Sequence, residues 1–98
     1  MSVMSECEYK ALLAECKNER DLTYPDAERE KKLENFLKLG MAWLNHKCDD
    51  TEINYATDLF ARALLLEYVR FCDCNAREQF EPKYRAEILD LQLTYKEV

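Results

Sequence analysis

Residues 57–71 read Thr-Asp-Leu-Phe-Ala-Arg-Ala-Leu-Leu-Leu-Glu-Tyr-Val-Arg-Phe, and this stretch decides the fold class. Placed on a helical wheel at about 100° per residue, its apolar side chains leave only a narrow polar arc, which is typical of a helix with neighbours on most sides. Asp49-Asp50-Thr51 could cap such a helix. The sequence therefore predicts a central apolar helix over about residues 52–72, the third in the chain.

Helical patterns flank this segment on both sides. Ser5 and Glu8 have the spacing of a capping box, which predicts a first helix near residues 6–18. Tyr24-Pro25-Asp26 places a proline and an acid at the start of a second helix, which ends near residue 47. The pattern breaks at residues 73–75, Asn75 and Glu78 could cap a short helical turn, and a last helix covers about 82–96. The apolar stripe of the second helix comprises Leu33, Phe36, Leu37, Met41 and Leu44, with Gly40 in line.

The composition agrees with a single all-α domain over residues 1–98. The chain has one glycine and two prolines, too few for the many tight turns of a β-fold. Apolar residues make up 48% of the chain and charged residues 35%, which is enough for both a core and a soluble surface. We therefore expect a compact four-helix domain.

Charge and hydropathy exclude several classes of function. The net charge is −6 and no block of five or more Lys/Arg occurs, so tight nucleic-acid binding is not expected. The longest near-uninterrupted apolar run, residues 63–66, is far below the roughly 20 residues of a membrane span. Five cysteines without a secretory leader fit a reducing cytoplasm.

The sequence contains no recognisable active site. Its only serines are Ser2 and Ser5, and a single glycine cannot build a phosphate-binding loop. His46, Cys48, Cys72 and Cys74 could together suit zinc, but a helix of roughly 30 Å separates the first pair from the second. We expect no enzyme activity, no metal and no cofactor. Cys7, Cys16 and Cys72 then act as small apolar residues, and Cys48 and Cys74 are exposed thiols.

Apolar residues on the polar arc of the third helix suggest a subunit interface. Asp58, Arg62 and Arg70 share this arc, Leu66 and Val69 fall inside it, and Tyr55 lies on the same side. Protein interfaces favour aromatic and arginine side chains around an apolar centre. The alternative is an isolated exposed Leu and Val, which soluble surfaces tolerate.

The last helix is apolar on two sides. We assign the face with Tyr84, Ile88 and Leu91 to the core, and the nearly opposite face with Leu89 and Leu93 to a partner. The assignment of the two faces could be reversed, or the helix could be sandwiched within the subunit.

The second half of the chain carries a resemblance to a known family. Residues 57–71, then Asn75-Ala76-Arg77-Glu78-Gln79-Phe80-Glu81, Tyr84 and the stretch 87–93 form its pattern. This pattern resembles the small helical head-to-tail connector proteins of long-tailed bacteriophages and prophages, also called adaptors or head-completion proteins. The resemblance covers roughly residues 25–95, and its motifs are packing patterns.

The resemblance implies a structural protein of the virion, assembled in the host cytoplasm. Its copies would form a ring, normally twelvefold, under the portal protein at the capsid vertex. The ring would join the portal to the next neck component, a stopper or tail-completion protein, while DNA passes through the centre without specific binding. Leu89 and Leu93 would then meet the portal or a neighbouring subunit.

Two further hypotheses stay open. Asp49, Asp50 and Glu52 could face the DNA channel and repel the passing duplex, unless Asp50 or Thr51 simply caps the third helix. The alternative function for the whole chain is a small helical interaction adaptor or regulator that binds one basic soluble partner.

Overall fold

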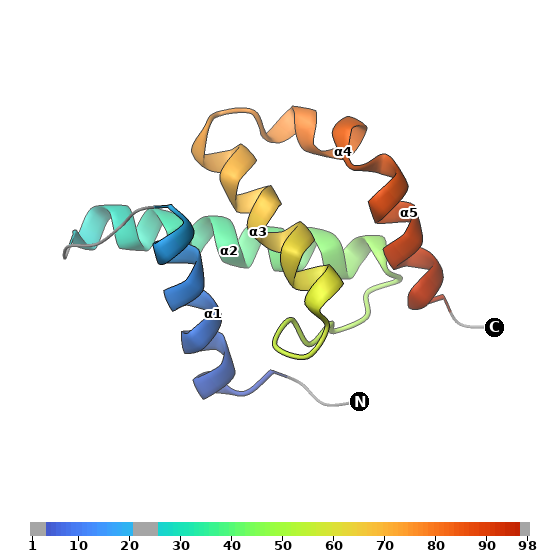
Figure 1. Cartoon of the computed structure of the whole chain (residues 1–98), viewed down its shortest axis with the longest axis horizontal. Helices are drawn as coiled ribbons and strands as arrows, with labels where there is room; N and C mark the ends of the chain where they lie inside the picture. The colour runs from blue at the N-terminus through green and yellow to red at the C-terminus, as the bar shows by residue number, and fades with distance from the viewer. Residues whose placement is uncertain (1–3, 21–25, 97–98) are drawn as a thin grey trace.

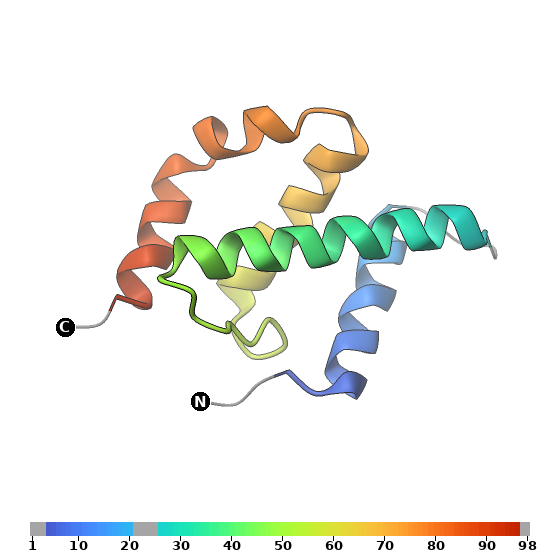
Figure 2. The same ribbon diagram turned by 180° about the vertical axis from the view of Figure 1, so that it is seen from behind.

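The central feature is a crossing of two helices, α2 (Ala27–Lys47) and α3 (Leu59–Asp73), in the computed structural model (Figure 1). The structure describes residues 4–20 and 26–96, and no strand occurs among them. The remaining elements are α1 (Glu6–Glu19), the single 3₁₀ turn η1 (Arg77–Gln79), α4 (Phe80–Lys83) and α5 (Arg85–Thr94). Both views place α1 and α5 on opposite sides of α3, with α2 behind α3 in Figure 1 and in front of it in Figure 2. The predicted all-α class is confirmed.

A glycine lets α2 and α3 approach closely. The buried residues Leu33, Leu37, Gly40 and Leu44 form one face of α2, which packs on α3. A Cβ atom at Gly40 would lie 2.7 Å from Cδ1 of Leu65 and 2.9 Å from Cδ1 of Tyr68, closer than carbon atoms can pack. The only glycine of the chain therefore serves the helix crossing rather than a turn.

The first two helices begin as the sequence predicts. The Ser5 hydroxyl accepts from the Glu8 backbone N–H at 3.1 Å, and the Glu8 carboxylate accepts from the Ser5 N–H at 2.9 Å. Asp26 caps α2 by accepting from the Arg29 N–H at 3.1 Å. The capping box, the cap by Asp26 and the two predicted helices are thus confirmed, while Tyr24 and Pro25, which are also expected at the start of the second helix, lie outside the described residues.

The predicted start of the third helix is wrong by seven residues, because a folded loop occupies residues 51–58. The Asn54 side chain accepts from the Ala56 N–H at 2.9 Å, a local turn that competes with a helix. Asp58, rather than residues 49–51, caps α3 by accepting from the Ala61 N–H at 3.0 Å. The loop also buries both Ile53 and Tyr55. In a helix these two residues would lie on nearly opposite faces.

Asn45 of α2 holds this loop in place. Its Oδ1 atom accepts from the Tyr55 hydroxyl at 2.8 Å and from the Ile53 N–H at 3.3 Å. Burial raises the pKa of the Tyr55 phenol, so the hydroxyl stays protonated and remains a donor at all moderate pH values.

We expect Tyr55→Phe to lower the free energy of unfolding by about 1–2 kcal/mol, since it removes this buried hydrogen bond and leaves the ring in place. Urea denaturation followed by circular dichroism would measure the loss. Tyr9→Phe is the control, because the Tyr9 hydroxyl bonds to Glu34 in a less buried setting. Equal stability of wild type and Tyr55→Phe would show that the hydrogen bond from the Tyr55 hydroxyl does not stabilise the loop.

The predicted last helix is broken at Tyr84 into α4 and α5, which corrects the four-helix architecture to five α-helices in the described residues. Pro82 lies in the first turn of α4, where its missing N–H costs nothing. The predicted cap by Asn75 is also not observed: no side chain caps η1. Phe80, at the start of α4, is surrounded by the aromatic rings of Trp43, Tyr68, Phe71 and Tyr84, with ring centroids 5.1–5.8 Å from its own.

One carboxylate joins the ends of three helices. Asp73, at the end of α3, accepts from Arg20 Nε at 2.9 Å and from Arg29 through both terminal nitrogens, with Nη2 at 2.7 Å. Only 6% of the Asp73 side chain is exposed. The hydrogen bonds from Arg29 hold the pKa of the Asp73 carboxyl below its usual range. This ion cluster connects the end of α1 and the start of α2 to the end of α3.

Candidate functional site

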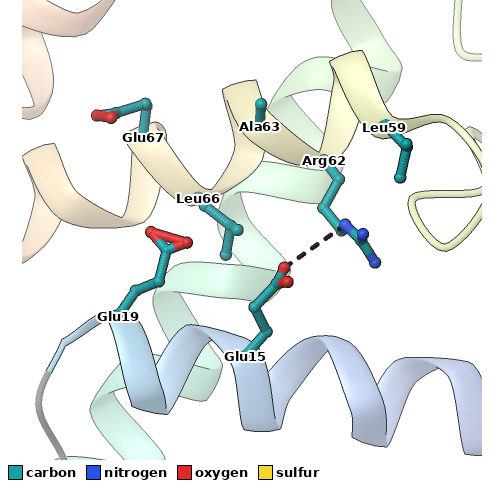
Figure 3. Close-up of a pocket in the computed structure, with 7 residues that line it drawn as sticks. All are labelled: Glu15, Glu19, Leu59, Arg62, Ala63, Leu66 and Glu67. Atoms are coloured by element: carbon teal, nitrogen blue, oxygen red, sulfur yellow. Dashed lines mark ion pairs between the residues drawn. The ribbon is translucent and has the colours of Figure 1, made fainter.

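The most distinctive surface is a groove between α1 and α3 (Figure 3). It has a volume of about 420 Å³. Its floor is apolar, made by Leu59, Ala63 and Leu66 at the i, i+4, i+7 spacing of one helical face of α3. Leu59 is 63% exposed, which is unusual for a leucine at the edge of a core. We call this the α1/α3 groove.

Charged side chains surround this apolar floor. Glu15 and Glu19 reach into the α1/α3 groove from α1, and Glu67 and Arg62 line it from α3. Arg62 Nε lies 3.5 Å from Glu15 Oε1, an ion pair but not a hydrogen bond. The lining therefore carries three carboxylates and one guanidinium, and the groove is acidic.

Two of these carboxylates have unused hydrogen-bonding capacity within the described residues. Glu15 Oε1 is buried and accepts no hydrogen bond. Glu19 forms no ion pair with any described residue, whereas Glu67 bonds to Arg70 at 2.7 Å. A buried acceptor without a donor costs free energy, so a cationic group entering the groove would be favoured.

Of the residues predicted to form a subunit interface on the third helix, some lie at the surface and others lie in the core. Arg62 and Leu66 line the α1/α3 groove, and Arg70 is exposed beside it with its guanidinium over the Phe71 ring. The expectation that Val69 and Tyr55 are exposed is wrong: both are buried. Val69 is part of the hydrophobic core. Tyr55 lies in the loop before α3 and not on the helix.

The second apolar surface lies on α5. Leu89 and Leu93 are 54% and 60% exposed, while Ile88 and Leu91 are buried. The predicted orientation of this helix is confirmed, with Tyr84 half-buried on the core side. Arg85 precedes the two leucines at the same four-residue spacing, and Lys96 follows the end of the helix; both are exposed. We call Arg85, Leu89, Leu93 and Lys96 the α5 stripe.

The acidic loop after α2 is exposed. Asp49, Asp50 and Glu52 all face solvent, and Asp50 Oδ1 lies 3.1 Å from His46 Nδ1. Neither Asp50 nor Thr51 caps α3, so the capping explanation for these acids is removed.

The cysteines and the histidine do not converge. No group of three metal-ligating side chains comes together in residues 4–20 and 26–96. Cys48 is buried rather than exposed, and Cys7 is exposed rather than buried, which reverses the expectation for these two residues. Burial raises the pKa of the Cys16 thiol to about 11 and also raises the pKa of Cys48 and Cys72, so these thiols stay protonated at neutral pH.

Comparison with models of protein families, with curated proteins and with solved structures gives no match for this chain. Among the described helices, none combines the length and the apolar character that crossing a bilayer requires. The α1/α3 groove and the α5 stripe together carry three of the five large apolar side chains that are exposed in the described residues, Leu59, Leu89 and Leu93.

Proposed function

We propose that this protein is an adaptor subunit of a tailed bacteriophage, forming a ring between the portal and the neck or tail with DNA passing through the centre. The proposal starts from the resemblance of residues 57–93 to head-to-tail connectors. The observation that carries it is the presence of two separate exposed apolar surfaces, the α1/α3 groove and the α5 stripe, on a domain of only 98 residues.

A ring requires two different contact surfaces on each subunit. In a closed ring, one patch of each copy meets a different patch of the next copy, whereas a twofold dimer uses one patch twice. One apolar surface lies between α1 and α3 and the other lies on α5, which is on the opposite side of α3 from α1, an arrangement that suits a ring (Figure 1). A small helical protein with a single partner needs only one such surface.

The proposed roles of the residues follow from their positions. Arg62 and Leu66 contact a neighbouring subunit, with Arg70 at the edge of that contact. Leu89 and Leu93 contact the portal or a neighbouring subunit. Asp49, Asp50 and Glu52 line the DNA channel, where their charge keeps the duplex from adhering.

Where a portal gene neighbours the gene of this chain, reconstitution with the portal protein that it encodes tests the proposal. We expect electron microscopy to show a ring of the chain on the portal. Leu89→Ser with Leu93→Ser should weaken attachment at least about tenfold, because apolar area is lost from the contact, without a change in the thermal melt. Leu39→Ser is the matched control: Leu39 is also exposed but lies on α2, outside both surfaces.

The same experiment distinguishes the adaptor function from the alternative function. The acidic α1/α3 groove favours a second candidate, a helical regulator that binds one basic soluble protein. Such a regulator would form a complex of fixed small mass and no ring on the portal. A chain that leaves the portal bare under these conditions would overturn the adaptor proposal.

A further inference from the structure

We infer that the α1/α3 groove of one copy receives the α5 stripe of the next copy. This inference rests on the proposed ring and names the two surfaces that would join its subunits. It assigns Leu89 and Leu93 to the neighbouring subunit rather than to the portal.

The two surfaces match in length and in apolar pattern. The α3 side of the groove runs from Leu59 to Glu67, about 12 Å at 1.5 Å per residue. The helical part of the stripe, from Arg85 to Leu93, also spans about 12 Å. Leu89 and Leu93 would lie over the floor of Leu59, Ala63 and Leu66, so that apolar side chains on both copies leave water together.

The two surfaces are also opposite in charge. Glu15, Glu19 and Glu67 surround the groove, while Arg85 and Lys96 stand at the two ends of the stripe. Within the described residues neither Arg85 nor Lys96 has an ion-pair partner, and neither does Glu19. The stripe thus supplies free donors to a groove that contains a buried carboxylate oxygen without one, Oε1 of Glu15. Of the acids of α5, Glu87 lies on another face, whereas the exposed Asp90 borders the stripe next to Leu93.

The position of the surfaces makes the contact a head-to-tail one. Both views show α1 on one side of α3 and α5 on the other (Figures 1 and 2). The groove and the stripe of a single copy therefore cannot satisfy each other, and each copy offers one free surface of each kind. Contacts of this type close into a ring when the rotation between copies allows it.

Exchanging the charges of the two surfaces tests the contact. The groove variant carries Glu19→Lys and Glu67→Lys, and the stripe variant carries Arg85→Glu and Lys96→Glu. We expect sedimentation equilibrium at low salt to show weak self-association of the wild-type chain, and self-association about tenfold weaker in each variant alone, because like charges then face each other. In the mixture, the basic groove of the groove variant meets the acidic stripe of the stripe variant. The acidic groove of the stripe variant meets the basic stripe of the groove variant, so association should return to the wild-type level.

A control separates this pairing from net charge. Glu28→Lys with Glu78→Lys changes the net charge as the groove variant does, but at exposed positions outside both surfaces, and should leave self-association unchanged. The inference would be overturned if the mixture of groove and stripe variants associated no more strongly than either variant alone. It would also be overturned if the wild-type chain stayed monomeric up to about 1 mM.

The result is distinguishable from a failure of the proposed function. If the chain forms a ring on the portal but the charge exchange does not restore association, the adaptor function stands and the stripe faces the portal. If the exchange restores association but no ring forms on the portal, the contact between copies stands and the adaptor function falls.

Discussion

Phe80→Ala should lower the free energy of unfolding by about 3–5 kcal/mol, a large part of the roughly 5–15 kcal/mol that stabilises a domain of this size. Phe80 is 1% exposed and stacks edge-on or tilted against four aromatic rings from α2, α3 and the Tyr84 joint. Alanine would leave a cavity that these rings cannot fill, because α2 and α3 hold Trp43, Tyr68 and Phe71 in place. Urea denaturation followed by the fluorescence of Trp43, the only tryptophan, would measure the loss.

Phe60→Ala provides the matched control for this substitution. Phe60 has the same side chain but is 44% exposed at the start of α3, so its removal should cost less than about 1 kcal/mol. Similar losses for the two variants would mean that the aromatic cluster does not hold η1 and α4 on the core.

Asp73→Asn should lower the free energy of unfolding by about 2–3 kcal/mol at neutral pH. The substitution removes the charge that accepts hydrogen bonds from Arg20 and Arg29, so α1, α2 and α3 lose their shared tie. The loss is below that of a fully buried pair, because both arginine side chains remain partly exposed to water. Chemical denaturation of both proteins across a pH series measures it.

The pH dependence identifies the cause. The pKa of the Asp73 carboxyl is lower in the folded chain than in the unfolded chain, where it is about 3.9. Its stabilisation is therefore complete above about pH 5 and is lost as the pH falls through the folded pKa. The difference between wild type and Asp73→Asn should shrink over this acid range, whereas the exposed control Asp90→Asn should differ little from wild type at any pH. A difference that is constant with pH would contradict the role of the charge.

Local signals in the sequence predicted the first half of the fold well. Ser5, Glu8 and Asp26 satisfy backbone N–H groups within three residues of themselves, so their role is readable from spacing alone. The start of α3 was not readable in this way. Asp49-Asp50-Thr51 and Asp58 are both suitable caps, and the choice depends on Tyr55 finding Asn45, ten residues away, on another helix.

In the candidate site, too, the features that depend on local periodicity could be predicted from the sequence, and those that depend on tertiary packing could not. The exposure of Leu89 and Leu93 follows from helical periodicity, since the opposite face of α5 carries Ile88 and Leu91. The α1/α3 groove could not be predicted, because it depends on the angle at which α1 meets α3. The arc predicted for α3 contained Arg62 and Leu66, but Glu15 and Glu19 come from a helix more than forty residues earlier and carry no local signal.

The two connections that flank α3 also shape the unfolded chain. Asp49 and Asp50, before α3, and Asn75, after it, adopt left-handed backbone conformations with φ of 59°, 57° and 55°. Most proteins place glycine at such positions, but aspartate and asparagine tolerate them at a small local cost. A chain with side chains at these positions has fewer backbone conformations to lose on folding than one with glycine. The connections before and after α3 therefore lose less conformational entropy on folding than glycine-containing connections would, which favours the crossing of α2 and α3.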